Sequence, residues 1–341
     1  MAWVEKYVSS QATGGGVGSS ADPWTIEEGF SNLAAGMVLY VINDGTYSPT
    51  ASLAPAAAIT SYDPPAMVVG CKSDLSIVLD LADAPVIDFS ALASGQGIDL
   101  VSSSSYSVFL YGLKAKNAPS SNIYVYQHSL VALCESENAG YGGFVASSYS
   151  SAVLCKAINA ASYGFSLGGH SCAAFCSYIG TDPPAATAFQ VKYTVGCYSI
   201  NANTEFKSQY HGGLAAMNTA VSTSATRAFA GFSISHGFAA LGNIVSGTDN
   251  GLVAAAGMLA AFNYFNNVTT PVDNQDASGE GPFEVATDTT TDPQFKDAAA
   301  GDYRPTNKDL QALFDMLKQN PGAFPFLPPG GWRPRPRLHG V

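Results

Sequence analysis

The chain has 341 residues, of which 47% are hydrophobic and only 12% are charged, and its formal net charge is -11. This profile excludes a disordered chain, which combines high net charge with few aliphatic residues, and a coiled coil, which needs Lys, Glu and Leu in heptads. No run of about eighteen apolar residues occurs, so we expect no membrane span. The acidic pI of about 4.7 argues against nucleic acid as the main partner.

The chain begins with Met1–Val17, which has no basic segment followed by an apolar core, so we expect no signal peptide and folding in a reducing cytoplasm. The six cysteines are then expected to be free thiols. The charge is uneven: residues 1–97 carry -8, residues 98–270 carry zero and residues 271–341 carry -3. The middle of the chain is therefore poor in charge and rich in Ser, Ala, Gly, Tyr and Val.

The segment Ser20–Gly36 predicts a short amphipathic helix, with apolar residues at Ile26, Phe30 and Leu33, acids in its first turn and Gly36 as its stop. A strand over residues 37–42 and a turn over residues 43–45 follow. A helix at this place would cover the open end of a stack of strands and prevent end-to-end association.

The middle of the chain repeats every 21 residues. Short alternating strands, such as residues 108–111 and 123–126, are separated by Gly, Ser, Asn and Pro, and no helical period fits between them. Asparagine recurs at the same period with Gly180 in the missing place, and Phe144 and Phe165 form another pair. The repeating residues are Cys134, Cys155, Cys176 and Cys197, and Asn117, Asn138, Asn159 and Asn201.

Coils of about 21 residues without helices predict an all-β fold, a right-handed parallel β-helix in which each coil stacks on the last. Equivalent residues then lie about 4.8 Å apart in rows. We expect a core row of thiols, a turn row of asparagines and an exposed ladder of alternating charge. That ladder would contain Lys114, Glu135 and Lys156 in one row, and Lys116 and Glu137 in the next.

The segment Tyr7–Tyr47 resembles the N-terminal cap and first coil of the pectate-lyase-like right-handed β-helix proteins, through its Gly-rich turn, Asp-Pro-Trp-Thr, helix and Gly-Thr-Tyr. Asp292–Asp297 with Gly301–Arg304 resembles their closing segment. The resemblance covers roughly residues 4–306, and the domains are a cap and first coil over residues 1–50, a β-helix body over 51–272 and a closing segment over 273–306. The chain departs from the family after Thr306, and we expect a short helix with a Pro/Arg-rich docking arm over 307–341. This superfamily includes lyases, hydrolases, adhesins and bacteriophage virion proteins.

Few residues in the repeats could perform catalysis. Lyase chemistry of this family needs clustered acids that hold Ca²⁺ and an Arg or Lys base, and the body has one arginine, Arg227. Hydrolysis needs two carboxylates about 5 to 9.5 Å apart. Glu135 and Glu137 are the close pair, which we interpret as part of the charge ladder. A site formed by Asp182, Glu205 and Asp249 stays open.

Three further patterns favour structural interpretations. Gly164–Gly168 matches Gly-x-Ser-x-Gly but lacks a following helix. His170, Cys172 and Cys176 have metal-ligand character but lack a fourth ligand. The acidic stretch 273–297 is interpreted as a solvated loop, with cation binding as the alternative. We expect no catalytic residue, no metal and no cofactor.

Because we expect no signal peptide, the chain looks most like the bacteriophage members of this superfamily. That resemblance implies a virion structural protein, and we favour a capsid decoration or cement protein that docks without catalysis. We expect it to be a homotrimer, to assemble in the host cytoplasm without membrane or nucleic acid, and to contact the major capsid protein or neighbouring subunits. The docking residues would be Trp332, Arg333, Arg335 and Arg337. The alternative is a tail-spike or fibre that binds host glycan or depolymerises it as a hydrolase or lyase.

Overall fold

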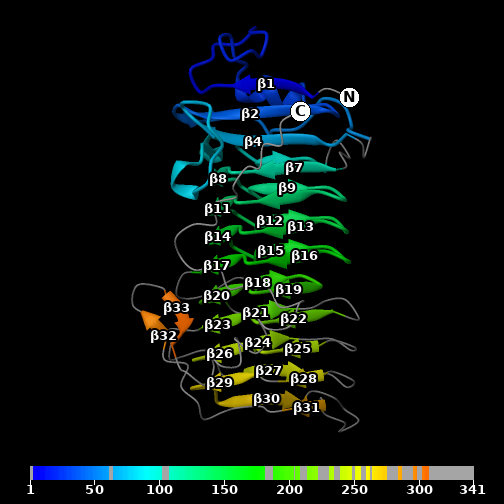
Figure 1. The fold of residues 1–341 in the computed structure, drawn as a ribbon, viewed down its shortest axis with the longest axis vertical. Coiled ribbons are helices and arrows are strands. Elements are labelled where there is room, and N and C mark those ends of the chain that lie inside the picture. Colours follow the sequence, from blue (N-terminus) through cyan, green and yellow to red (C-terminus); the bar gives the residue numbers. More distant parts are fainter. Residues whose placement is uncertain are drawn as a thin grey trace, which may run out of the picture. The chain divides into compact units, whose positions relative to one another are not determined.

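A computed structural model describes residues 3–60, 64–101, 107–180, 187–202, 204–207, 213–221, 230–233, 239–247, 250–254, 259–261, 263–274, 283–285, 295–297 and 302–306. The chain divides into two units, Met1–Thr291 and Asp292–Val341. The first unit is a solenoid built from three parallel sheets, and the second contains an antiparallel pair, β32 (Phe295–Asp297) and β33 (Asp302–Pro305) (Figure 1). The prediction of a right-handed parallel β-helix is confirmed.

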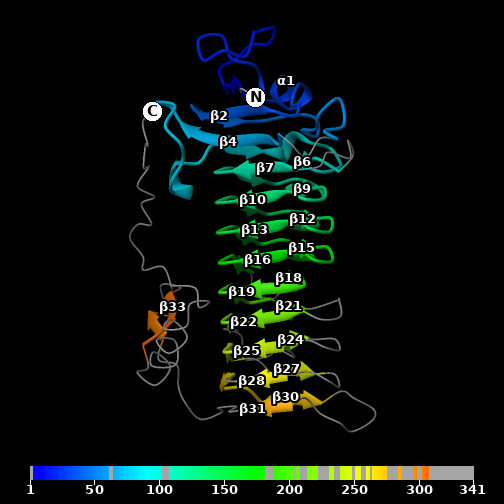
Figure 2. The ribbon, with the colours of Figure 1, turned by 45° about the vertical axis from the view of Figure 1, so that its right-hand side comes forward.

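From β4 to β30 each coil contributes one strand to each sheet, in the order A, B, C along the chain (Figure 2). Sheet A contains β1 (Val4–Val8), β2 (Met37–Asn43), β4 (Ala66–Lys72), β7 (Val108–Tyr111), β10 (Leu130–Ala132), β13 (Ser151–Val153), β16 (Cys172–Ala174), β19 (Tyr193–Val195), β22 (Leu214–Ala216), β25 (Ala239–Leu241), β28 (Leu259–Ala261) and β31 (Phe283–Val285).

Sheet B contains β3 (Thr46–Tyr47), β5 (Val86–Asp88), β8 (Lys114–Lys116), β11 (Glu135–Glu137), β14 (Lys156–Ile158), β17 (Ser177–Ile179), β20 (Tyr198–Ile200), β23 (Thr219–Val221), β26 (Ile244–Ser246) and β29 (Tyr264–Asn266). Sheet C contains β6 (Ile98–Asp99), β9 (Ile123–Val125), β12 (Gly142–Ala146), β15 (Tyr163–Leu167), β18 (Thr187–Gln190), β21 (Thr204–Lys207), β24 (Ala230–Ser233), β27 (Asn250–Ala254) and β30 (Thr270–Asn274).

The N-terminal cap contains the helix α1 (Ile26–Ser31), which begins at the N-cap Thr25 with a reciprocal capping box to Glu28. The Glu28 carboxylate also accepts the Gly15 N–H at 2.6 Å and so ties the Gly-rich turn to the helix. The helix ends at Asn32 and not at Gly36, because the Asn32 N–H and side chain bond back to the last turn. Two short 3₁₀ helices, Leu81–Asp83 and Phe89–Ala91, lie in the first coils.

The core is made of rows of like side chains. The rings of Phe144, Phe165, Phe189 and Phe206 stack with centroids 4.8 to 4.9 Å apart. The sequence period places Ala186, not Phe189, after Phe165. Three extra residues lie between β17 and β18, compared with β14 and β15. Three fewer lie between Phe189 and Tyr193 than between the equivalent Phe165 and Cys172, so the coil keeps its length and the phenylalanine keeps its row.

The corner between sheets A and B carries the row of buried cysteines. Each thiol of Cys155, Cys176 and Cys197 donates to a carbonyl 24 residues earlier, at 3.3 to 3.4 Å. After Cys197 the row continues with asparagine: the amides of Asn218 and Asn243 donate to the carbonyls of the equivalent positions in the preceding coils. The thiols and the amides therefore form equivalent hydrogen bonds, each to a buried carbonyl at this corner.

We predict that Asn243→Ala lowers the free energy of unfolding by about 3 kcal/mol, because it leaves several buried partners unsatisfied. The Asn243 side chain bonds to Asn218, Asn263 and the Ala215 carbonyl. Urea denaturation measures the loss. The control is Asn138→Gly at an exposed turn whose positive φ suits glycine; a loss as large as that of Asn243→Ala would contradict the prediction.

Candidate functional site

The outer face of sheet B carries most of the charge in the first full coils. Residues 85–180 contain seven charged residues, and all but Asp99 lie at outward positions of β5, β8, β11 and β14. We define this set as the charged face: Asp88, Lys114, Lys116, Glu135, Glu137 and Lys156. The strand register places Glu135 between Lys114 and Lys156, and places Glu137 beside Lys116.

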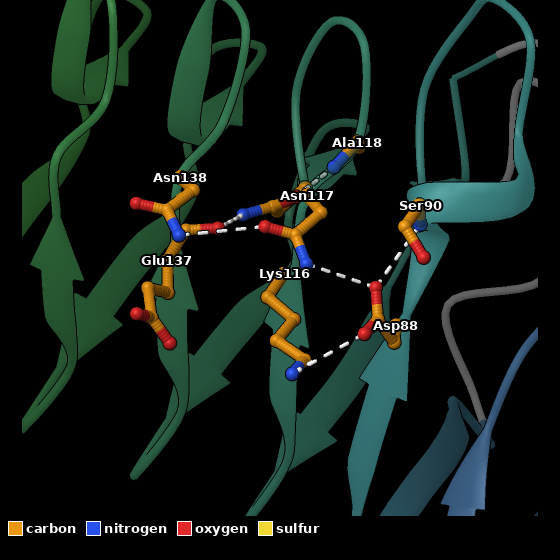
Figure 3. Close-up of polar contacts among 8 residues, drawn as sticks. Asp88, Ser90, Lys116, Asn117, Ala118, Glu137 and Asn138 are labelled. Atoms are coloured by element: carbon orange, nitrogen blue, oxygen red, sulfur yellow. Dashed lines mark hydrogen bonds and ion pairs between the residues drawn. The ribbon is translucent and has the colours of Figure 1, made fainter.

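The ion pairs on this face differ from the predicted ladder, in which each acid pairs with the lysine of a neighbouring strand. Lys156 Nζ lies 3.3 Å from Glu135 Oε2, whereas Lys116 Nζ turns to Asp88 Oδ2 at 3.2 Å. Within the described part of the chain, Lys114 and Glu137 have no ion-pair partner within 4.0 Å. Figure 3 shows Glu137 and Lys116 on neighbouring strands, with Lys116 bonded to Asp88. The face thus presents one lysine and one glutamate that no opposite charge holds.

Asp88 organises one end of the charged face. Its Oδ1 accepts from Asn117 Nδ2 at 2.9 Å and from the Ser90 N–H at 3.0 Å (Figure 3). Burial acts to raise the pKa of Asp88, but the hydrogen bonds from Asn117, Ser90 and Lys116 outweigh it, so this pKa lies below its ordinary value. Sequence reasoning missed Asp88 because β5 and β8 are separated by more than one repeat length.

The asparagine row runs beside the charged face at the end of each sheet B strand. Asn117, Asn138, Asn159 and Asn201 all have positive φ, the conformation that the turn requires. The Asn138 and Asn159 amides each donate to the preceding asparagine at 3.4 Å. A second asparagine, the fully buried Asn122, donates to the Glu137 carbonyl at 2.8 Å and holds the end of β11 from inside.

The residues proposed for metal binding point to different places. His170 is exposed and stacks on Tyr149 with ring centroids 5.0 Å apart, Cys172 lies on the outer face of sheet A, and Cys176 is buried in the core. Burial raises the pKa of Cys172 to about 11 and raises that of Cys176 as well, so neither is a ready thiolate. In the described residues, no three His, Cys, Asp or Glu side chains gather as a metal site.

Ser166 of the Gly-x-Ser-x-Gly pattern lies within β15, a strand of sheet C, and no helix follows it among the elements of the structure. The docking residues Trp332, Arg333, Arg335 and Arg337 lie outside the described residues. So do Asp182, Arg227 and Asp249, the side chain of Glu205, and the side chains of the acidic stretch 273–297. Among the described helices, none is long and apolar enough to cross a membrane.

The fold has counterparts among solved structures. The crystal structure of pectate lyase Pel9A matches with a TM-score of 0.56 at 14% identity, covering 87% of this chain and 83% of that chain. The alginate lyase from Paenibacillus sp. str. FPU-7 aligns with a TM-score of 0.40 at 13% identity, covering 77% and 96%. No family model and no curated protein matches the chain. The chain therefore has the pectate-lyase-like β-helix fold.

The likeness to pectate lyase Pel9A corrects the prediction that the chain is not an enzyme. The same coil stack, over most of both chains, is the scaffold of a lyase. Sparse charge on such a scaffold is thus no ground for excluding catalysis, because a few outward side chains on one sheet are enough to form a site. The expectations of a virion location, a trimer and a capsid partner stay predictions.

We predict that Asp88→Asn destabilises the protein most above about pH 5 and least in acid. A carboxylate whose folded pKa is depressed stabilises the fold above its unfolded pKa of about 3.9, and this stabilisation disappears as the pH falls through the folded pKa. Urea midpoints of both proteins from pH 7 to pH 2 measure the difference. A difference that stays constant across this range would contradict the assignment.

Proposed function

We propose that this chain degrades a carboxylate-bearing polysaccharide on the charged face of sheet B. The observation that carries the proposal is the pair of outward carboxylates on one strand, Glu135 and Glu137. Lys114 lies on the neighbouring strand and has no ion pair among the described residues. Outward residues two apart on a strand have Cα atoms about 6.6 Å apart. Their carboxyl groups can therefore reach the separation of about 5 to 9.5 Å that glycoside hydrolysis uses.

The two glutamates have different surroundings, as hydrolysis requires. Glu135 is held beside Lys156 at 3.3 Å and serves as the charged base or nucleophile. Glu137, without a cation within 4.0 Å among the described residues, gives a proton to the leaving sugar oxygen. Asn122 fixes the backbone of β11 beneath Glu137 through its bond to the Glu137 carbonyl. Lys114 binds the carboxylate of the sugar.

Elimination is the alternative way to cleave such a polymer, and it needs a neutral base beside the sugar. Lys114 lies opposite Glu135 in the register and is the residue of this face that we assign to binding the sugar carboxylate. Glycoside hydrolysis instead uses two carboxyl groups, and β11 places two of them on the same outer face. Hydrolysis by the two glutamates is the chemistry that this face supports best.

We predict that purified protein releases new reducing ends from an acidic polysaccharide and that Glu137→Gln and Glu135→Gln each reduce the rate about 100-fold or more. The substrates are polygalacturonate, alginate, hyaluronan and uronate-containing bacterial capsules. Glu27→Gln on the exposed first turn of α1 is the matched control and should keep full activity.

Ultraviolet absorbance of the products distinguishes the two chemistries. Products with an unsaturated sugar would show elimination and would overturn the hydrolytic roles of Glu135 and Glu137. Activity that survives both substitutions would show that the active site does not lie on the charged face. Absence of cleavage across all of these polymers would contradict the proposed function.

A further inference from the structure

The outer face of sheet A differs from the charged face in holding no charge at two aligned outward positions of every strand from β2 to β25, although Lys72 ends β4. Two aligned positions on each of these nine strands point away from the core, and none of the eighteen is a charged residue. Most are apolar or aromatic and partly exposed, among them Tyr111, Leu130, Val153, Tyr193 and Val195.

A solvated sheet face normally alternates apolar residues inward with polar residues outward, and parallel sheets are normally covered on both faces. Sheet B follows this rule in its first coils, with lysines and glutamates outward, and sheet A does not. The apolar surface also extends around the corner to Leu154, which is 42% exposed. Sheet A therefore has the side-chain pattern of a sheet that a second layer covers.

The size of this face is that of a functional surface. Nine strands at about 4.8 Å give a length of about 40 Å, and an average of four residues per strand gives a width of about 13 Å. The resulting area is on the order of 500 Å², somewhat smaller than the roughly 800 Å² that each partner buries in a standard interface. An apolar patch of this size on a monomer is often a functional surface.

We propose that copies of this chain associate through the outer faces of sheet A. The side chains on this face recur at every strand, so a surface with the same spacing can place one residue against each coil. A second copy has that spacing by construction, and two sheets packed face to face bury both apolar layers about 10 Å apart. Self-association through one face also closes with symmetry and leaves no open apolar surface.

The test places charge in the proposed interface and measures the mass in solution by light scattering. The wild-type protein should have a mass of at least twice the 35.3 kDa of one chain. The double variant Val153→Glu with Val195→Glu should have the mass of one chain, because two buried, unpaired carboxylates oppose association. Val145→Glu, on the outer face of sheet C, is the matched control and should keep the wild-type mass.

Several results would overturn the proposal. They are a wild-type chain that is monomeric at tens of micromolar, a double variant that keeps the wild-type mass, and a control that dissociates like the double variant. A monomeric wild type that binds polysaccharide or another protein through this face would overturn it as well.

A second measurement needs no change to the apolar face. Cys172 lies on this face and is half-buried, whereas the other five cysteines are buried. A bulky polymer-linked maleimide should therefore react with Cys172 slowly in concentrated protein and at least tenfold faster after dilution below the dissociation constant of the complex. Cys172→Ser supplies the blank. A rate that is independent of protein concentration would show that the face is open and the proposal wrong.

Discussion

The structure depends on one constraint, the parallel pairing of each coil with the next in exact register about 4.8 Å away. Every side chain then lies against its equivalent in the neighbouring coils, so each position needs side chains that can pack favourably on one another. Phenylalanine rings stack, thiols and amides satisfy the same corner carbonyl, and acids alternate with bases. This requirement explains why the body is rich in small and apolar residues and poor in charge.

The same constraint turns each sheet into a surface with its own chemistry. The outward positions of sheet B near the N-terminal end collect carboxylates and amines, while the aligned outward positions of sheet A are uncharged and mostly apolar over nine strands. A surface built this way is long, regular and rigid, as recognition of a repeating polymer or of a second regular sheet requires. The charged face is proposed for the polymer and sheet A for another copy of the chain.

The rows that repeat every 21 residues were predictable from the sequence, since the Cys and Asn spacings fix the coil length and the β-helix follows from it. Phe189 was not, because compensating changes in the loops on either side of β18 move it off the period, and the next coil places Phe206 one residue before the period. The charged rows were predictable, but their pairing was not. Lys116 forms its ion pair with Asp88, which lies 28 residues earlier, and not with Glu137 as predicted. The prediction that the chain is not an enzyme was wrong because it took sparse charge as evidence against catalysis, whereas pectate lyase Pel9A has the same fold.

The measurement that tests the stacking constraint most directly is the removal of one whole coil. Deleting residues 155–175 joins Leu154 to Cys176, which occupies the same row as Cys155, so the account predicts a folded protein with native-like circular dichroism and a cooperative urea transition. Deleting residues 155–174 instead shifts the following strand by one position and turns its core residues outward, so that protein should not fold cooperatively. Equal stability of the two deletion variants would contradict the account.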